Sequence, residues 1–176
     1  MSANVISAEV LAKMFLAGAK YLENNKDYIN ELNVFPVPDG DTGTNMTLTI
    51  LSAAKELNAV SHSDMAAVCK AVSGGSLRGA RGNSGVILSQ LIRGFTKVAT
   101  NYGTLGIAEL DEACQKAVKT AYKAVMKPKE GTILTVAASV ATKAEELHNA
   151  GVTDLKEFLE AVLIDIISEC PGIIIS

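Results

Sequence analysis

Apolar residues recur at helical spacing along most of this chain. In residues 7–24 they fall on one stripe at steps of three and four, at Leu11, Met14, Phe15 and Leu22. Gly18 lies on the same stripe, where it would let a neighbouring helix approach closely. Ser7 stands where a helix N-cap is expected. The pattern therefore predicts a first amphipathic helix over residues 7–24.

The same periodicity predicts a series of further helices. They cover residues 44–57, 63–73, 84–99, 107–126, 132–150 and 154–169, with one short turn at 26–32. Strand signals are weak, because proline interrupts and follows Val34–Val37 and cannot donate to a ladder, and Ile173–Ile175 is short. We expect an all-α bundle of seven or eight helices. No repeat or linker divides the chain, so residues 1–176 are predicted to form one domain.

Composition narrows the class of protein. The 176 residues are 48% hydrophobic and 20% charged, which is typical of a globular chain and not of a disordered one. The net charge is -3, and the basic residues are too scattered to offer a nucleic-acid surface. No apolar run reaches the ~20 residues needed to span a bilayer. No signal peptide is recognisable, and the three cysteines, Cys69, Cys114 and Cys170, are widely spaced. Both observations predict free thiols in the cytoplasm.

The stretch "NVFPVPDGDTGTNM" at residues 33–46 carries the strongest chemical signal. Pro36 and Pro38 stiffen the turn, and Gly40 permits a sharp bend between Asp39 and Asp41. Two like charges so close are unfavourable unless a cation lies between them, and carboxylate oxygens suit Mg²⁺. The residues after the second acid do not continue an EF-hand. A plain Asp–Gly turn with an aspartate N-cap remains the alternative.

The helix that follows this turn adds a second signal. Thr42–Asn45 would expose backbone amides at a helix start, and such an end favours anions through its donors and its dipole. A cation site beside an anion site suits a polyphosphate bound with Mg²⁺.

Two more loops precede helices. "GGSLRGARGNSG" at 74–85 lets the backbone approach closely at Gly82 and Gly85, with Asn83 or Ser84 as the helix cap, but it matches neither the GxxxxGK[ST] loop nor a dinucleotide fingerprint. A phosphate cradle and a structural turn are equally open there. The loop at 126–131 reads as a plain connection with Thr132 as the next cap. If the three helix starts share one end of the bundle, the loops form one site.

Nucleophilic catalysis finds no support. There is no GxSxG motif, and His62 and His148 lie in polar surroundings without an evident partner, where solvent-exposed structural roles are expected. Phosphoryl transfer depends on positioning and charge neutralisation more than on a side-chain nucleophile. The pattern therefore argues against a hydrolase and is compatible with a kinase.

Three blocks together resemble a known family. "LNVFPVPDGDTGTNM" at 32–46, "GARGNSGVILSQLIRGF" at 79–95 and "AYKAVMKPKEGTILTVA" at 121–137 are similar to the N-terminal kinase domain of bacterial fatty acid kinase, a relative of the dihydroxyacetone kinase L subunit. The resemblance implies a barrel of antiparallel helices that binds ATP and Mg²⁺ at one end. By position, the metal ligands and catalytic residues would be Asp39 and Asp41, with Asn33 near a further metal-binding acid of relatives. Nucleotide contacts would come from Thr42, Thr44, Asn45, Asn83, Ser84, Gly85, Gly131 and Thr132.

The resemblance also implies an activity. A fatty-acid-binding partner protein would present the acyl carboxylate, and the kinase would transfer the γ-phosphoryl group of ATP to give an acyl phosphate for phospholipid metabolism. The family's later "DSGG"-like stretch and further domains are not found in this sequence. That absence keeps a nucleotide-binding regulatory module without turnover as an alternative. A dihydroxyacetone-type kinase subunit is a further alternative, although the "PVP" entry and the "GARGNSG" block match the fatty acid branch better, and a homodimer is left open.

Overall fold

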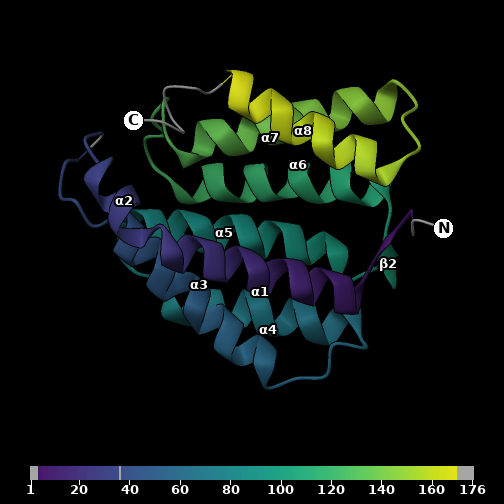
Figure 1. Ribbon diagram of the computed structural model, residues 1–176, viewed down its shortest axis with the longest axis horizontal. Coiled ribbons are helices and arrows are strands. Elements are labelled where there is room, and N and C mark those ends of the chain that lie inside the picture. Colours follow the sequence, from purple (N-terminus) through teal and green to yellow (C-terminus); the bar gives the residue numbers. More distant parts are fainter. Residues whose placement is uncertain (1–3, 36, 170–176) are drawn as a thin grey trace.

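The computed structural model describes residues 4–35 and 37–169, and this part of the chain is almost entirely helical (Figure 1). The helices are α1 (Ala8–Asn24), α2 (Lys26–Glu31), α3 (Thr42–Asn58), α4 (Met65–Gly79), α5 (Gly82–Ala99), α6 (Ile107–Ala124), α7 (Ile133–Asn149) and α8 (Leu155–Glu169). The predicted all-α architecture of seven or eight helices is confirmed. Pro36, Cys170 and the weak strand candidate Ile173–Ile175 lie outside the described residues.

One short sheet was not predicted from the sequence. Strands β1 (Ile6–Ser7) and β2 (Thr104–Leu105) pair antiparallel, with Ile6 opposite Leu105. Both of these side chains are buried in the core. The pairing ties the start of α1 to the connection between α5 and α6.

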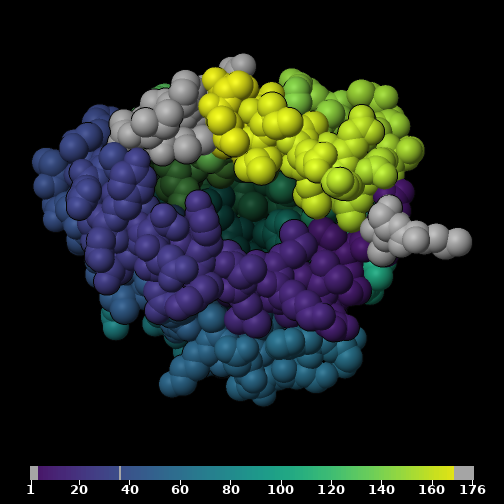
Figure 2. Space-filling view, in the orientation of Figure 1, coloured from purple at the N-terminus to yellow at the C-terminus, as the bar shows by residue number. Residues whose placement is uncertain are grey.

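Helices that follow one another along the chain pack side by side from α3 to α8, and α1 packs on α3. Figure 2 shows a hollow between α1, in purple, and α8, in yellow. A cavity of about 300 Å³ lies among α1 and α4 to α7 and is lined almost entirely by apolar groups. No described helix is long and apolar enough to cross a bilayer.

Side-chain caps explain why several helices begin where they do. Ser7 accepts a hydrogen bond from the amide of Val10 at 3.3 Å, as its position predicted. Asp64 accepts from the amide of Ala67 at 2.9 Å at the start of α4, and Thr132 caps α7. The backbone amides at these helix starts are capped by the residue just before each helix, which is why the sequence pattern could locate the starts.

The predicted glycine-rich loop at 74–85 is wrong over most of its length. Helix α4 continues to Gly79, so that only Ala80 and Arg81 separate it from α5. A Cβ on Gly75 would lie 2.6 Å from the Cα of Ala53 on α3, so the two backbones meet there without room for a side chain. Close packing of α4 on α3 offsets the low helix propensity of glycine. A Cβ on Gly18 would meet no atom of the described residues within 4 Å, and the predicted close approach is wrong.

The histidines have partners that the sequence did not reveal. His148 Nδ1 on α7 lies 2.7 Å from Asp111 Oδ2 on α6, and Gln115 donates to the Ala141 carbonyl at 2.8 Å across the same pair of helices. His62 Nε2 lies 3.0 Å from the carbonyl oxygen of Leu57. His148 therefore joins α7 to α6, whereas His62 closes the turn that follows α3.

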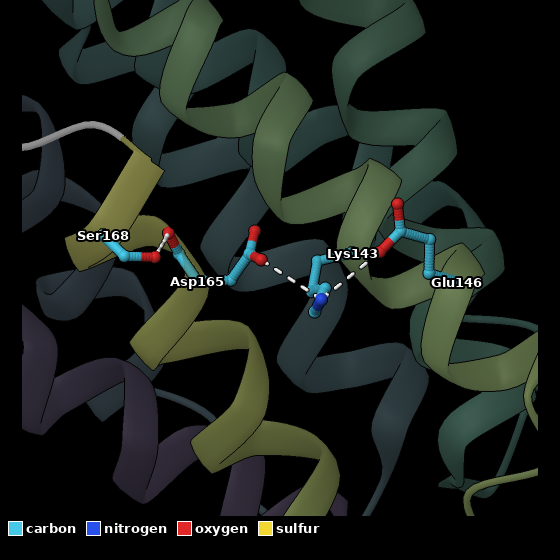
Figure 3. Close-up of polar contacts among 4 residues, drawn as sticks. All are labelled: Lys143, Glu146, Asp165 and Ser168. Carbon is cyan, nitrogen blue, oxygen red and sulfur yellow. Dashed lines mark hydrogen bonds and ion pairs between the residues drawn. The ribbon is translucent and has the colours of Figure 1, made fainter.

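Lys143 attaches α8 to α7. Its ammonium group lies 3.2 Å from Asp165 on α8 and 3.3 Å from Glu146 on its own helix (Figure 3). Hydrogen bonds to Asp165 and then to Glu146 raise the pKa of Lys143. The lysine is therefore held in its charged form between two carboxylates.

Cys69 and Cys114 are free thiols that line the apolar cavity. Burial raises the pKa of each to about 11, with smaller contributions from Asp64 and Asp111 respectively. Both are therefore protonated at neutral pH and behave as apolar core groups.

Candidate functional site

The starts of α3, α5 and α7 meet at one cavity of about 520 Å³. Residues of all three predicted loops line it, and α2 forms another wall. The condition set for a single site, that the three helix starts meet, is therefore fulfilled. The predicted site residues in the lining are Asn33, Asp39, Asp41, Thr42, Asn45, Asn83, Ser84, Gly131 and Thr132.

Asp39 and Asp41 keep their carboxylates free. Both are solvent-exposed and line the cavity, and neither side chain hydrogen-bonds or pairs with another described residue. Gly40 between them has a φ of +66°, which supplies the bend that the sequence predicted. Asp41 occupies the N-cap position of α3 but makes no capping bond there. The capping bond that the plain-turn alternative assigned to an aspartate is therefore not made.

Two asparagine side chains, rather than Asp41, accept hydrogen bonds from the backbone amides at the start of α3. Asn33 Oδ1 accepts from the amides of Asp41 at 3.2 Å and Thr42 at 3.3 Å, and its Nδ2 donates to the Val37 carbonyl at 3.0 Å. Asn30 Oδ1 on α2 accepts from the amide of Thr44 at 3.0 Å. The expectation that Thr42–Asn45 exposes free amides is therefore wrong for most of this helix start. Asn33 was predicted to be a metal ligand, but its side-chain oxygen already accepts hydrogen bonds from the Asp41 and Thr42 amides.

The start of α5 is the open one. Helix α5 begins at Gly82 with Arg81 as its N-cap, and no side-chain bond caps it, so the prediction that Asn83 or Ser84 caps this helix is wrong. Its first amides border the cavity without a capping acceptor among the described side chains. Such an end favours an anion. The anion site predicted at the start of α3 is therefore better placed at the start of α5.

Buried Thr49 joins the first two loops. Its hydroxyl donates to the Asn45 carbonyl at 2.7 Å and accepts from the Arg81 amide at 3.2 Å. Gly82 has a φ of +57°, and a Cβ there would collide with the side-chain amide of Asn45. The Thr49 hydrogen bonds and the close approach of Gly82 to Asn45 hold the start of α5 against α3, next to the acidic loop of residues 33–41.

Two predicted nucleotide contacts lie outside the cavity lining. Thr44 Oγ1 accepts from Asn30 Nδ2 at 2.9 Å. Gly85 is buried, and a Cβ there would collide with the hydroxyl of Thr49. Thr44 and Gly85 thus have evident structural roles, and their contact with nucleotide stays a prediction.

The third loop is held by α7. Thr132 caps this helix, as predicted, and donates to the Lys129 carbonyl at 2.8 Å. Gly131 has a φ of +74°, and its amide donates to Thr135 Oγ1 at 3.0 Å. A Cβ on Gly131 would lie 3.9 Å from the ring of Phe35, so this loop faces the acidic loop across the cavity.

Sequence reasoning missed the apolar side of the cavity. It is lined by Tyr28, Ile29, Leu32, Phe35, Val37, Met46, Ile87, Ile133 and Val136. The available signal was the spacing of apolar residues in 26–32, which places three of them together on or next to α2. The cavity therefore has an apolar wall beside its carboxylates and helix starts, as a ligand with both an apolar and an anionic part requires.

The donor set fits Mg²⁺ only if a ligand completes it. Among the described residues no group of three or more His, Cys, Asp or Glu side chains could hold a metal ion. Asp39 and Asp41 line the cavity with hard oxygen atoms of the kind that such an ion binds. Mg²⁺ is usually bound by one or two carboxylates, with waters and substrate phosphates filling its remaining positions. The free carboxylates beside the open start of α5 fit that arrangement.

Fold and site define an all-helical domain whose paired carboxylates share a cavity with three helix starts. The chain belongs to the DAK2 domain family, whose sequence profile matches residues 36–166. It is therefore a dihydroxyacetone kinase L-subunit-like domain, a kinase-related module, as the resemblance implied. The narrower assignment to fatty acid kinase stays a prediction.

Curated relatives of high similarity are themselves longer proteins. Protein YloV of Bacillus subtilis (strain 168) is 49% identical over 162 residues, which are 92% of this chain and 29% of that protein. Uncharacterized protein SAB1090 of Staphylococcus aureus (strain bovine RF122 / ET3-1) and uncharacterized protein SAUSA300_1119 of Staphylococcus aureus (strain USA300) are each 48% identical over 159 residues, 90% of this chain and 29% of theirs. The chain thus spans under a third of the length of these relatives.

Proposed function

We propose that this chain is a single ATP-binding domain that holds ATP and Mg²⁺ in the three-loop cavity. It would serve transfer of the γ-phosphoryl group to a fatty acid carboxylate presented by a partner protein. The observation that carries the proposal is the pair of carboxylates, Asp39 and Asp41, which have no partner among the described residues and share a cavity with the uncapped start of α5. Membership of a kinase-related family and the resemblance of the three loop blocks support it.

In the proposed reaction a carboxylate oxygen of the acceptor attacks the γ-phosphorus, and the bond from that phosphorus to the β,γ-bridging oxygen breaks. ADP and an acyl phosphate are the products. An ionised carboxylate is already a nucleophile, so this reaction does not require a general base to activate it. Mg²⁺ bound to Asp39 and Asp41 would neutralise phosphate charge. The amides at the start of α5 would orient the phosphates, and the apolar wall would exclude water.

Titration of a non-hydrolysable ATP analogue with and without Mg²⁺ tests this proposal. We expect Asp41→Asn to weaken Mg²⁺-dependent binding at least about tenfold, because a neutral amide is a poorer ligand for a hard cation. Unfolding free energy should change by less than about 0.5 kcal/mol, since the carboxylate is exposed and caps nothing. Asp27→Asn, which alters an exposed acid outside the cavity lining, is the control. Binding that ignores both Mg²⁺ and Asp41 would refute the proposal.

Family membership favours a second candidate, a dihydroxyacetone-type kinase subunit. Supplying the chain with ATP, Mg²⁺ and either a fatty acid on its binding protein or dihydroxyacetone on a suitable partner separates the two acceptors. Tight Mg²⁺-ATP binding without turnover of either acceptor would instead identify a regulatory module.

A further inference from the structure

The start of α3 poses a physical question. The first amides of a helix need acceptors from outside it, and an aspartate at the N-cap normally supplies one. Asp41 occupies that position, yet its side chain makes no such bond. Something else must hold the helix start if the Asp41 carboxylate is to remain free.

Asn30 and Asn33 hold it. Asn33 Oδ1 accepts from the amides of Asp41 and Thr42, at 3.2 and 3.3 Å. Asn30 Oδ1 accepts from the Thr44 amide at 3.0 Å, and its Nδ2 donates to the Thr44 hydroxyl at 2.9 Å. Both amide groups come from the segment immediately before the acidic loop, so the cap is supplied across the loop.

Packing makes this arrangement specific. A Cβ on Gly43 would collide with the Lys26 carbonyl and lie 2.9 Å from Asn30 Oδ1, so α2 lies directly against the start of α3. Asn33 borders the cavity, whereas Asn30 is absent from its lining. Asn30 is therefore expected to act on a ligand through the start of α3, which its side chain holds.

We infer that Asn30 and Asn33 are positioning residues that cap α3 in place of Asp41 and thereby keep the Asp41 carboxylate available to a metal ion. This inference rests on the proposed function. Without the asparagine cap, the Asp41 carboxylate turns back onto the amides of its own helix and is withdrawn from the cation. Asn33 then acts by closing the loop through its oxygen, and it is not itself a ligand.

Substitution at Asn30 tests the inference. We expect Asn30→Ala to weaken Mg²⁺-dependent binding of the ATP analogue by roughly two- to thirtyfold, the range that corresponds to one competing N-cap bond. Asn30→Asp keeps an acceptor for the Thr44 amide and can accept from its hydroxyl, so binding should stay within about twofold of wild type. Asn101→Ala is the matched control, because it removes an asparagine bond to the Lys97 carbonyl at the far end of α5.

A measurement on the metal-free protein tests the cap by itself. Hydrogen exchange at the Thr44 amide should speed up in Asn30→Ala and stay slow in Asn30→Asp and Asn101→Ala. If Asn30→Ala does not fold, Asn30→Ser, whose shorter side chain makes a poorer acceptor, is expected to show the same changes in smaller size.

The outcomes separate the inference from the proposed function. Wild-type protein that binds no Mg²⁺-nucleotide refutes the proposed function and with it the metal part of the inference, while exchange still decides whether Asn30 caps α3. Faster exchange with unchanged Mg²⁺-dependent binding in Asn30→Ala overturns the positioning role alone. An equal loss of binding in Asn30→Ala and Asn30→Asp also overturns it, because a cap role requires rescue by the acidic residue.

Discussion

Replacement of Gly82 by alanine tests how tightly the second loop is fitted against the first. The residue has a φ of +57°, in the left-handed region that side chains disfavour. A Cβ at this position would lie 2.8 Å from Asn45 Cγ and 3.4 Å from Asn45 Cβ, so the whole Asn45 side chain must move. Asn45 lines the cavity, and the change should therefore affect both stability and binding.

The expected magnitude has two parts. A left-handed conformation costs an ordinary residue about 1–2 kcal/mol. Displacing Asn45 from its rotamer adds about 0.5–1.5 kcal/mol. The sum, about 1.5–3.5 kcal/mol, corresponds to a fall in Tm of about 3–14 °C for a chain of this size.

Urea denaturation followed by circular dichroism measures the change in unfolding free energy. Gly151→Ala is the matched control, because Gly151 has a φ of +78° and a Cβ there would meet no atom of the described part of the chain within 4 Å, so that only the backbone part of the cost applies. We expect Gly82→Ala to be the more destabilising of the two and the only one to weaken nucleotide binding. Equal losses of stability, or unchanged binding in Gly82→Ala, would show that the contact with Asn45 does not set the loop geometry.

Three further predictions follow from particular groups. Gly18→Ala should stabilise the chain by about 0.4–1 kcal/mol in the same denaturation assay, because Gly18 is helical with open space around it. In a Cys170→Ser background, Cys69 and Cys114 should react with Ellman's reagent at pH 8 far more slowly than an unfolded control, since burial raises the pKa of both to about 11. Lys143→Gln should lower Tm at pH 8. Because the hydrogen bond to Asp165 raises the pKa of Lys143 from its ordinary 10.5, its stabilising effect is present below that pH, and the gap from wild type should close as pH rises through the folded-state pKa.

Local signals determined much of what the sequence predicted. Apolar spacing located the long helices, and the caps at Ser7 and Thr132 marked where two of them begin. The acidic turn around Gly40 and its place before a helix were readable for the same reason, since each depends on residues adjacent in the chain. The sequence also placed three loops before helices, but whether these loops meet depended on how the helices pack.

Only the tertiary structure decided how these pieces are used. The run from Gly74 to Gly79 is helical because α4 packs backbone to backbone on α3, an interaction with no trace in local propensity. The cap of α3 comes from Asn30 and Asn33, so the aspartate that local rules assign to capping is left free. Periodicity and capping are encoded over a few residues. Which of two competing acceptors satisfies a helix start depends on distances between segments, and these exist only once the chain has folded.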